Sequence, residues 1–465
     1  MKLHQPNWIS WERWRLAGRR FGFQRCNLPA GRRRSQDASV LILVLWISIG
    51  LVAIALYFAN SMTFELRASD NRATGIAAEQ AIEGAARYVG WALVNFATNG
   101  AMPNNTQFAC AAVPVGDAHF WLIGRDPAGA LSTEPYFGLV DEASKLSLNR
   151  AGTNALSYLP NMSLDFASAI VDWRNTNGGA YSLNYSTLGY LDKNYPFETV
   201  DELRLVYGST MDLLVGEDVN RNGVLDTSEK DLNGNGTLDP GLFEFTTVYS
   251  RQPNFHADGT MLTNVNSRAT LRSLLQTTFG TTRANQITNR LGPAPLRNLL
   301  QFYLLSGMTS TEFARIAYEI TDTNSLYTNG LLNINTASAP VMEALFMGLN
   351  VDQSTAMAAA QSLVTYRQQN PNNISAISWM VDALGNNNTV VTTLVNAGRD
   401  YITTQSYQFT ADIAALGPFG RGYRRVKFIF DTSSGTPQIV YRQDLTHLGW
   451  ALGRYVRQDW LAAAQ

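Results

Sequence analysis

An uncharged apolar run near the start of the chain constrains its fold more than any other feature. The run covers 22 residues from Ala38 to Ala59 and contains two serines but no charged side chain. As a helix it extends ~33 Å at ~1.5 Å per residue, enough to cross the hydrocarbon core of a bilayer. It is too long for the apolar part of a cleaved signal peptide, and Tyr57–Asn60 does not fit a small-residue cleavage site. We therefore expect one retained membrane span.

Charge is divided unevenly around this run. Residues 1–37 contain nine basic and two acidic residues, a net of +7, whereas the whole chain of 465 residues has a net charge of -1. The remaining residues therefore carry -8. Because basic segments stay on the cytoplasmic side, we expect residues 1–38 to be a cytoplasmic leader and the acidic remainder to lie outside the cytoplasm.

The helix is predicted to continue past the membrane. From Met62 to about Asn99 there is no proline, and apolar residues recur every three or four positions opposite a charged face. We expect one helix of about 60 residues whose second half needs a covering partner. Cys26 and Cys110 fall on opposite sides of the predicted membrane, so they are not expected to pair.

This layout resembles that of type IV pilins and of the pseudopilins of type II secretion. Further blocks along nearly the whole chain are similar, in the same order, to the general secretion pathway protein K family, the large minor pseudopilins. The similar blocks are Ser39–Trp46, Asp141-Glu142 with Leu146–Asn149, Ala169–Arg174, Lys193–Leu203, Leu332–Ala337, Tyr401–Thr404 and Arg442–Trp450.

The resemblance implies processing and assembly. Family members are cut by a prepilin peptidase just before the apolar helix, which places the cut here between Ala38 and Ser39, with Ala38 replacing the usual glycine. Most pilins carry a glutamate at the fifth mature position, which pairs with the N-terminal amine of a neighbour. Leu43 occupies this position. An apolar fifth residue is known of this member and implies a place at the tip of the pseudopilus.

The same resemblance implies location and partners. It places the chain in the bacterial inner membrane as a single-pass protein with a periplasmic globular domain, supporting protein export across the outer membrane. The implied partners are minor pseudopilins I and J, which would pack along residues 39–99, the major pseudopilin, the inner-membrane assembly platform and the prepilin peptidase.

Segments rich in β-forming residues flank a long stretch whose sequence pattern predicts mostly helix. The predicted fold class is α+β, with a pilin-like long N-terminal helix packed on a small antiparallel sheet and a large, mostly α-helical inserted domain. The predicted divisions are a membrane part at 39–59, the amphipathic helix and first strands at 60–145, the insertion at 146–400 and closing strands at 401–465. The predicted strands are His119–Ile123, Tyr136–Val140, Tyr407–Ala411, Arg424–Phe430 and Gln438–Arg442, with a turn at Ser433–Pro437.

A weak internal repeat lies inside the predicted insertion. Leu146–Asn149 precedes two helices separated by a turn at Leu159–Met162, and Leu332–Thr336 precedes two helices separated by a turn at Gly348–Asn350. Both units resemble the helix-hairpin-helix of DNA-binding proteins. A DNA-uptake or type IV pilus-related envelope protein is therefore the alternative function.

DNA-binding hairpins use a Gly-x-Gly turn because only glycine lets the backbone approach a phosphate so closely. The first turn has no glycine, and the second has Gly348 but Asn350 at the second position. The acidic domain also lacks the basic footprint that DNA affinity requires. We therefore interpret both units as packing modules and expect no nucleic-acid partner.

A calcium-binding pattern is the sharpest chemical signal. One segment matches the EF-hand loop at positions 1, 3, 5, 6, 9 and 12, with the carbonyl of Val224 at position 7; its residues are Asp218, Asn220, Asn222, Gly223, Val224, Asp226 and Glu229. A second loop follows at Asp231, Asn233, Asn235, Thr237 and Asp239. Its twelfth position is Leu242, so the bidentate acid is missing, and Glu244 substitutes only if the loop runs differently.

The oxygen donors of both loops suit a cation that prefers ~6–8 oxygen ligands, so we expect calcium in a structural role. A surface turn rich in Asn, Asp and Gly is the alternative, since its composition is similar.

Catalysis is not expected. The four histidines are scattered and none has the spacing of a metal or catalytic site: His4, His119, His256 and His447. The acid pairs Asp141-Glu142 and Asp201-Glu202 have no visible partner, and we interpret them as a solvated turn and a helix face.

Overall fold

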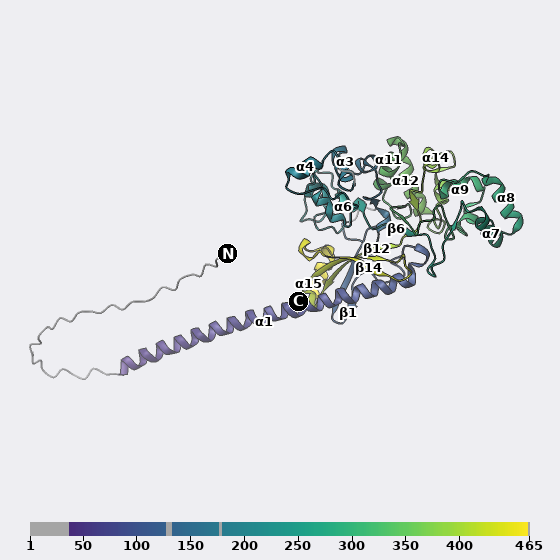
Figure 1. Ribbon diagram of the computed structural model, residues 1–465. Helices are drawn as coiled ribbons and strands as arrows, with labels where there is room; N and C mark the ends of the chain where they lie inside the picture. The colour runs from purple at the N-terminus through teal and green to yellow at the C-terminus, as the bar shows by residue number, and fades with distance from the viewer. Residues whose placement is uncertain (1–36, 127–132, 176–178, 464–465) are drawn as a thin grey trace, which may run out of the picture. The chain divides into compact units, whose positions relative to one another are not determined.

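The computed structural model describes residues 37–126, 133–175 and 179–463, and the predicted leader with Cys26 lies almost wholly outside this range. Figure 1 shows its helices and strands. The chain divides into two compact units, residues 1–67 and 68–465. Helix α1 runs from Asp37 to Phe96 and contains 60 residues, which confirms the predicted long helix.

In the first unit, α1 is apolar all round. Every large apolar side chain from Val40 to Phe64 is exposed, including Leu43 at 60%. A helix with apolar side chains on all sides is suited to lipid. In the described part of the chain, one helix is long and apolar enough to cross a membrane, and its qualifying stretch lies within Val40–Phe96.

The second unit is built around an antiparallel sheet of order β1-β2-β12-β13-β14, with β3 also paired to β12. The central strand β12 pairs with β2 on one side, at Ile413↔Leu122, and with β13 on the other, at Thr410↔Ile429. The strands are β1 Val113–Val115, β2 Ala118–Ile123, β3 Val140–Asp141, β12 Gln408–Leu416, β13 Arg424–Asp431 and β14 Gln438–Asp444.

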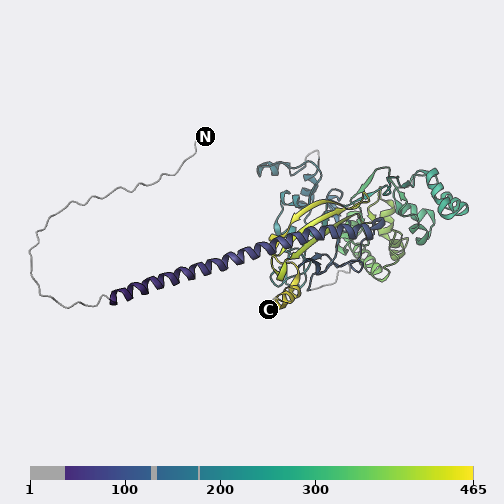
Figure 2. The same cartoon turned by 90° about the horizontal axis from the view of Figure 1, so that it is seen from below.

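The second half of α1 packs on one face of this sheet, as predicted (Figures 1 and 2). Ile82 and Val89 on α1 are fully buried and share one hydrophobic core with Phe120, Phe409 and Phe428 of the strands. Alanines fill most remaining positions of the buried stripe and let the helix approach the sheet closely; they are Ala78, Ala81, Ala85, Ala86 and Ala92. The apolar side chains at alternate positions of the strands therefore pack against the apolar stripe of the helix.

The opposite face of the sheet has a smaller core. Trp121 and Leu416 point to this side and contact the buried Ala451 and Leu452. The chain then forms α15, Gly453–Ala463, a helix in the stretch where only closing strands were predicted.

Other strand predictions hold, with one exception. The strand predicted at Tyr136–Val140 is reduced to β3, Val140–Asp141, and an isolated bridge between Phe137 and Ile123. Gly138 lies so close to Gly124 that a Cβ on Gly124 would meet its backbone at 2.9 Å.

The chain leaves the sheet after β3 and returns at β12, so the residues between form an insertion with its own core. Short parallel pairs β4·β5, β7·β8 and β10·β11 and the antiparallel pair β6·β9 lie within it. Its elements are β4 Leu146–Ser147, α2 Thr153–Ser157, α3 Leu164–Trp173, α4 Ser182–Thr187, the 3-10 helix Val200–Leu205, α5 Met211–Val215, α6 Leu242–Phe245, β5 Thr246–Thr247, β6 Arg251–Pro253, β7 Thr263–Asn264, α7 Arg268–Phe279, α8 Thr281–Leu291, α9 Leu299–Ser306, α10 Ser310–Ala314, β8 Ile320–Thr321, β9 Tyr327–Asn329, β10 Leu332–Asn333, α11 Ala339–Gly348, α12 Gln353–Gln369, α13 Trp379–Leu384, α14 Thr389–Asn396 and β11 Ile402–Thr403.

The acid pair Asp141-Glu142 joins the sheet to the insertion, so the solvated turn predicted for it is wrong. Both residues are buried, with exposed fractions of 2% and 1%. The Asp141 carboxylate accepts hydrogen bonds from Asn333 at 2.9 Å, Thr336 at 2.5 Å and Ser406 at 2.6 Å. Two sequence blocks that are 190 residues apart are therefore held together by one carboxylate.

The buried carboxylate of Glu142 has two hydroxyl groups and a lysine as its partners. It accepts from Thr247 and Thr410, each at 2.5 Å, and pairs with Lys145 at 3.4 Å. Burial alone would raise its pKa, but the ammonium charges of Lys145 and Lys427 and the two hydroxyl donors lower the pKa to about 2.

The internal repeat is a structural repeat of two helix–turn–helix units, α2–α3 and α11–α12. At or near the end of each second helix, an arginine donates to the carbonyl of the alanine before the first helix: Arg174 to Ala151 at 2.5 Å and Arg367 to Ala337 at 2.7 Å. In each turn an asparagine adopts a left-handed conformation, Asn161 at φ 58° and Asn350 at φ 66°. Burial lowers the pKa of both arginines to about 10.

Gly348 is needed where the two units meet, which gives a testable prediction. A Cβ at this position would lie 2.5 Å from the Cβ and 2.7 Å from the Cα of Ala155 on α2. Gly348→Ala is therefore expected to lower the free energy of unfolding by about 1–3 kcal/mol through overpacking. Gly398→Ala, which meets open space, is the matched control and should change it by less than about 0.5 kcal/mol in urea denaturation. Equal effects of the two changes would contradict this role.

Candidate metal centre

The first loop lies between α5 and α6, and its polar side chains are hydrogen-bonded to one another and to the backbone of the loop. The Asp218 carboxylate accepts from the backbone N–H groups of Asn222 and Gly223, both at 2.9 Å. Asn220 and Asn222 each donate their side-chain amide to the same oxygen of Asp226, at 2.6 and 2.9 Å. Gly223 has a φ of +84°, which glycine adopts without strain and which closes the turn as predicted.

The second loop repeats these contacts thirteen residues later. Asp231 accepts from the backbone N–H groups of Asn235 at 3.2 Å and Gly236 at 2.7 Å. Asn233 and Asn235 donate their side-chain amides to one oxygen of Asp239, at 2.5 and 2.9 Å. The backbone N–H of Thr237 donates to Asn235, as that of Val224 donates to Asn222 in the first loop. The structure thus brings the donors of each loop together, one loop beside the other.

A residue that the sequence analysis missed completes the symmetry. In the first loop, Glu229 accepts from the N–H of Asn220 and of Asp226, both at 3.0 Å. In the second loop, the buried Glu217 accepts from the N–H of Leu232 at 2.6 Å and of Asp239 at 3.0 Å.

Glu217 therefore stands where the missing twelfth ligand of the second loop is needed. A linear motif does not reveal it, because Glu217 precedes both loops. The signal is spatial: the isolated bridge between Gly216 and Pro240 brings Glu217 beside the end of the second loop.

The substitute weighed from the sequence, Glu244, is used elsewhere. Its carboxylate forms a two-point ion pair with Arg125, with nitrogen–oxygen distances of 2.8 and 2.9 Å. Leu242 at the nominal twelfth position is buried at the start of α6. The backbone of the second loop therefore does not place Glu244 among the oxygen groups of that loop.

Two arginines, one buried and one partly exposed, tie the first loop to the sheet. Arg425 on β13 is fully buried, pairs with Asp412 at 2.6 Å and donates to the backbone carbonyls of Asn220 and Arg221. Arg125, just after β2, donates to the carbonyl of Arg221 at 3.3 Å. The first loop is consequently a joint between insertion and sheet, whereas the second loop is mostly exposed.

The donor set fits a hard cation. Asp218 is 3% exposed, and burial raises its pKa to about 6; the nearby carboxylates of Glu244 and Glu229 add to the rise and Arg125 opposes it. A buried carboxylate beside other carboxylates is stabilised by a bound cation. Among the residues described, no three His, Cys, Asp or Glu side chains converge, so a site here relies on asparagine and carbonyl oxygens as well, which are typical ligands of calcium.

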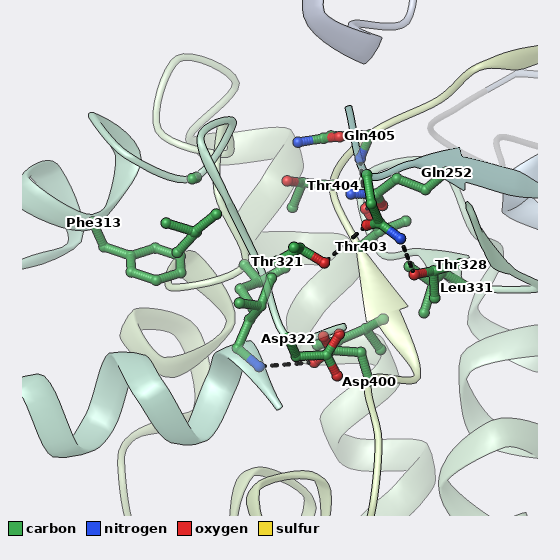
Figure 3. Close-up of a pocket in the computed structure, with 16 residues that line it drawn as sticks. Gln252, Phe313, Thr321, Asp322, Thr328, Leu331, Asp400, Thr403, Thr404 and Gln405 are labelled. Atoms are coloured by element: carbon green, nitrogen blue, oxygen red, sulfur yellow. Dashed lines mark hydrogen bonds between the residues drawn. The ribbon is translucent and has the colours of Figure 1, made fainter. Parts of the chain in front are cut away.

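A second acidic pair occupies a small pocket in the insertion. Figure 3 shows Asp322 and Asp400 side by side at one end of this pocket. Burial raises the pKa of both carboxyls, and the charge of Asp322 adds to the rise at Asp400, whose carboxylate accepts from the N–H of Leu299 at 3.0 Å. The cavity of about 30 Å³ holds only one or two waters and leaves no room for a substrate.

The predicted processing and assembly residues lie at the start of α1. The backbone of Ala38 and Ser39 is helical, directly after Asp37. Leu43 follows in the second turn, and its side chain is exposed. Cleavage between Ala38 and Ser39 remains a prediction.

The turn of the second helix–turn–helix unit directs its backbone inward. The N–H groups of Leu349 and Val351 both donate to the carbonyl of Phe346, and that of Asn350 donates to Met347. These are the groups that would bind a phosphate, so the turn favours the predicted packing role over the DNA-binding alternative.

Comparisons with known proteins bear on this same part of the chain. The family model for type II secretion system (T2SS), protein K matches residues 332–395. No curated protein sequence matches the chain. A chain in the crystal structure of the GspK-GspI-GspJ complex from the enterotoxigenic Escherichia coli Type 2 Secretion System is similar, with a TM-score of 0.40 and 11% identity over 79% of this chain and 96% of that chain.

The structural likeness is too distant to assign function or partners. The family segment, by contrast, covers one of the similar sequence blocks, Leu332–Ala337, together with helices α11 to α13 and all but the last residue of α14. Residues 332–395 of this chain therefore match the family model for type II secretion protein K, which supports the family predicted from the sequence.

Proposed function

We propose that this chain is the minor pseudopilin at the tip of a type II secretion pseudopilus and supports protein export across the outer membrane. The observation that carries the proposal is the combination of a protein K segment with an apolar helix that lacks carboxylates at its start. Residues 38–64 contain no charged side chain, and the first acid of α1 after Asp37 is Glu65. With Leu43 at the fifth mature position, no carboxylate lies near the new N-terminus to pair with the amine of a subunit above.

The proposed partners are minor pseudopilins I and J, the major pseudopilin and the inner-membrane assembly platform. A lateral surface suited to helical partners is present on α1 in the second unit. Ile76, Trp91 and Val94 are 51%, 52% and 57% exposed, although they lie on a helix whose opposite face is fully buried. Exposed large apolar groups on one helix face favour packing against neighbouring helices.

We assign calcium a structural role in this function. Asp218, Asn220, Asn222, Asp226 and Glu229, with the carbonyl of Val224, would hold one ion. The second ion would be held by the corresponding donors of the second loop, with Glu217 as its bidentate acid: Asp231, Asn233, Asn235, Thr237 and Asp239. Calcium would neutralise the clustered acids and stiffen the glycine-rich joint that Arg425 and Arg125 fasten to the sheet.

Processing gives the first test of the proposal. Full-length protein co-produced with a prepilin peptidase and recovered from bacterial membranes is expected to begin at Ser39 on N-terminal sequencing. An intact Met1, or an end near Ser61, would contradict the pseudopilin assignment. Ala38→Leu is expected to block cleavage because the small residue before the cut is lost.

Position in the fibre gives the second test. Pseudopili formed with an epitope-tagged chain are expected to bind antibody-coated gold at one end only. Regular labelling along the fibre would overturn the tip assignment while leaving the pseudopilin assignment intact.

A further inference from the structure

A second cavity, in the insertion, is lined by cations and by no acid. Its volume is about 360 Å³, at the lower end of the range for small-ligand sites. Lys145, Arg150 and Arg399 line it, and among its lining residues none carries a carboxyl group. The remaining wall combines polar residues and glycines with aliphatic side chains, which include Leu332, Leu345 and Leu349.

Two arginines are gathered around one aromatic ring at this cavity. The guanidinium carbons of Arg150 and Arg399 lie 5.4 and 5.1 Å from the ring centre of Tyr401. The contact with the ring face uses no N–H group, so those of Arg399, which have no acceptor among the described residues, stay available for a ligand. Burial and the charge of Arg399 lower the pKa of Arg150, and an anion that contacts both arginines would offset the repulsion between them.

The hydrogen bonds of these arginines leave their charge uncompensated. Arg150 donates to the backbone carbonyls of Asn329, at 2.6 Å, and Asp400, and both acceptors are neutral. Its Nε is buried and has no acceptor within the described chain. Arg399 is exposed and forms no hydrogen bond or ion pair with the residues described. Lys145, in contrast, is already paired with Glu142.

Two carboxyls, those of Asp322 and Asp400, act on Arg150, and each raises the pKa of its guanidinium against the effect of burial. Asp322 and Asp400 lie in the neighbouring small pocket (Figure 3), where burial favours their protonated forms by raising the pKa of each. The Asp400 side chain is also directed to the N–H of Leu299 rather than to Arg150.

The geometry points to a carboxylate-binding pocket formed by Arg150, Arg399 and Tyr401, which takes the carboxylate of a short aliphatic acid. The planar guanidinium groups match the two oxygens of a carboxylate, and the leucine wall fits an aliphatic chain attached to it. The carboxylate belongs either to a protein chain, as an acidic side chain or C-terminus, or to a free dicarboxylate. This inference is independent of the tip assignment and of the calcium loops.

Titration calorimetry on the full-length chain in detergent micelles tests this pocket. The probes are glutarate, the peptide acetyl-Ala-Ala-Leu with a free carboxyl terminus, and the same peptide with an amide terminus. Binding of either acid, together with loss of binding on amidation of the peptide, is expected. Binding of glutarate identifies a free acid as sufficient, whereas binding of the peptide acid alone identifies a protein chain as the source.

Substitution assigns the binding to the pocket. Arg399→Gln is expected to weaken the acid at least roughly tenfold, since one charge-assisted hydrogen bond is worth ~1.5–3 kcal/mol. The matched control is Arg315→Gln, because Arg315 also lies over an aromatic ring, Phe279, at 4.9 Å, but lines no part of the cavity. The control should bind like the wild type, and both variants should keep the wild-type melting temperature.

Three results would overturn the inference. They are the absence of binding by both acids, equal affinity in wild type and Arg399→Gln, and equal binding of the amidated peptide. A fourth probe, duplex DNA at physiological salt, tests whether the pocket binds a phosphodiester instead of a carboxylate. DNA affinity that is lost in Arg399→Gln would replace the carboxylate by a phosphodiester and would also count against the proposed function.

Discussion

Removal of calcium with EGTA is expected to lower the melting temperature of the full-length chain in detergent by about 5–10 °C. A ligand at about one hundred times its Kd stabilises the folded state by ~2.7 kcal/mol, and each kcal/mol shifts the midpoint of a domain of this size by a few degrees. Stability should respond because the first loop, through Asn220 and Arg221, links the insertion to Arg425 of the sheet. Differential scanning fluorimetry with and without added calcium measures the shift.

Two substitutions separate the loops. Glu229→Gln should remove one of two calcium ions counted by calorimetry and most of the thermal shift, because the first loop is the buried one. Glu217→Gln should remove the other ion, because Glu217 accepts from the N–H groups of the second loop as Glu229 does in the first. The matched control is Asp258→Asn, which alters an exposed Asp-Gly turn outside both loops.

The assignment of the loops fails if EGTA leaves the melting temperature unchanged. The role of Glu217 fails separately if its variant still binds two ions with wild-type affinity. Binding of a single ion by the wild type, lost in Glu229→Gln, would leave the second loop as a surface turn.

Glu142→Gln is expected to lower the free energy of unfolding at pH 7 by roughly 3 kcal/mol. The change removes the buried negative charge that faces Lys145 and Lys427, and uncompensated buried charges are costly. The size follows from the folded-state pKa of about 2 against the ordinary value of 4.5. Urea denaturation of both proteins at a series of pH values measures the difference.

The pH dependence has a definite sign. Since the pKa of Glu142 is lower in the folded state, its contribution is complete above pH 4.5 and is lost as the pH falls toward about 2. The gap between wild type and Glu142→Gln should therefore close over this range. Glu198→Gln is the matched control: its carboxylate is 73% exposed and pairs with Lys193 at 3.6 Å, so a change within about 0.5 kcal/mol is expected at any pH. A constant gap between pH 7 and pH 2.5 would show that Glu142 acts by shape rather than by charge.

Elements with a regular pattern could be predicted from sequence. The apolar run from Ala38 and the periodic stripe up to Leu93 sufficed for α1, because a helix of this length depends on local spacing and on the absence of proline. The strands at β2, β12, β13 and β14 followed from alternation in the same way. Helix α15 was missed because residues 401–465 were assigned to closing strands alone, although its apolar residues recur at helical spacing.

The residues that come together within each oxygen-rich loop were also predictable, because the EF-hand pattern is a fixed local spacing. Glu217 and the arginine tethers were not. Arg425 is 205 residues from Asn220, and only the folded chain brings the two within hydrogen-bonding distance.

The acid pair Asp141-Glu142 shows where sequence reasoning failed. Asp141 and Glu142 read as a solvated turn because no partner lies near them in the chain, yet both are buried and their partners include Asn333 and Thr410. A buried carboxylate is tolerated only when donors or cations surround it, and most of these groups come from distant segments: Asn333 and Thr336 lie 192 and 195 residues from Asp141, and Thr410 lies 268 residues from Glu142.

The sequence by itself determined the apolar anchor, the long helix, the order of the strands, the protein K resemblance and the two oxygen-rich loops. All of these depend on residue type at short, regular spacing. The tertiary structure decided which buried charges are paired, that Glu217 joins the second loop, and that Arg150 and Arg399 meet at one ring. The physical reason is that charge compensation and cavity shape depend on distances through space, which the spacing along the chain does not record.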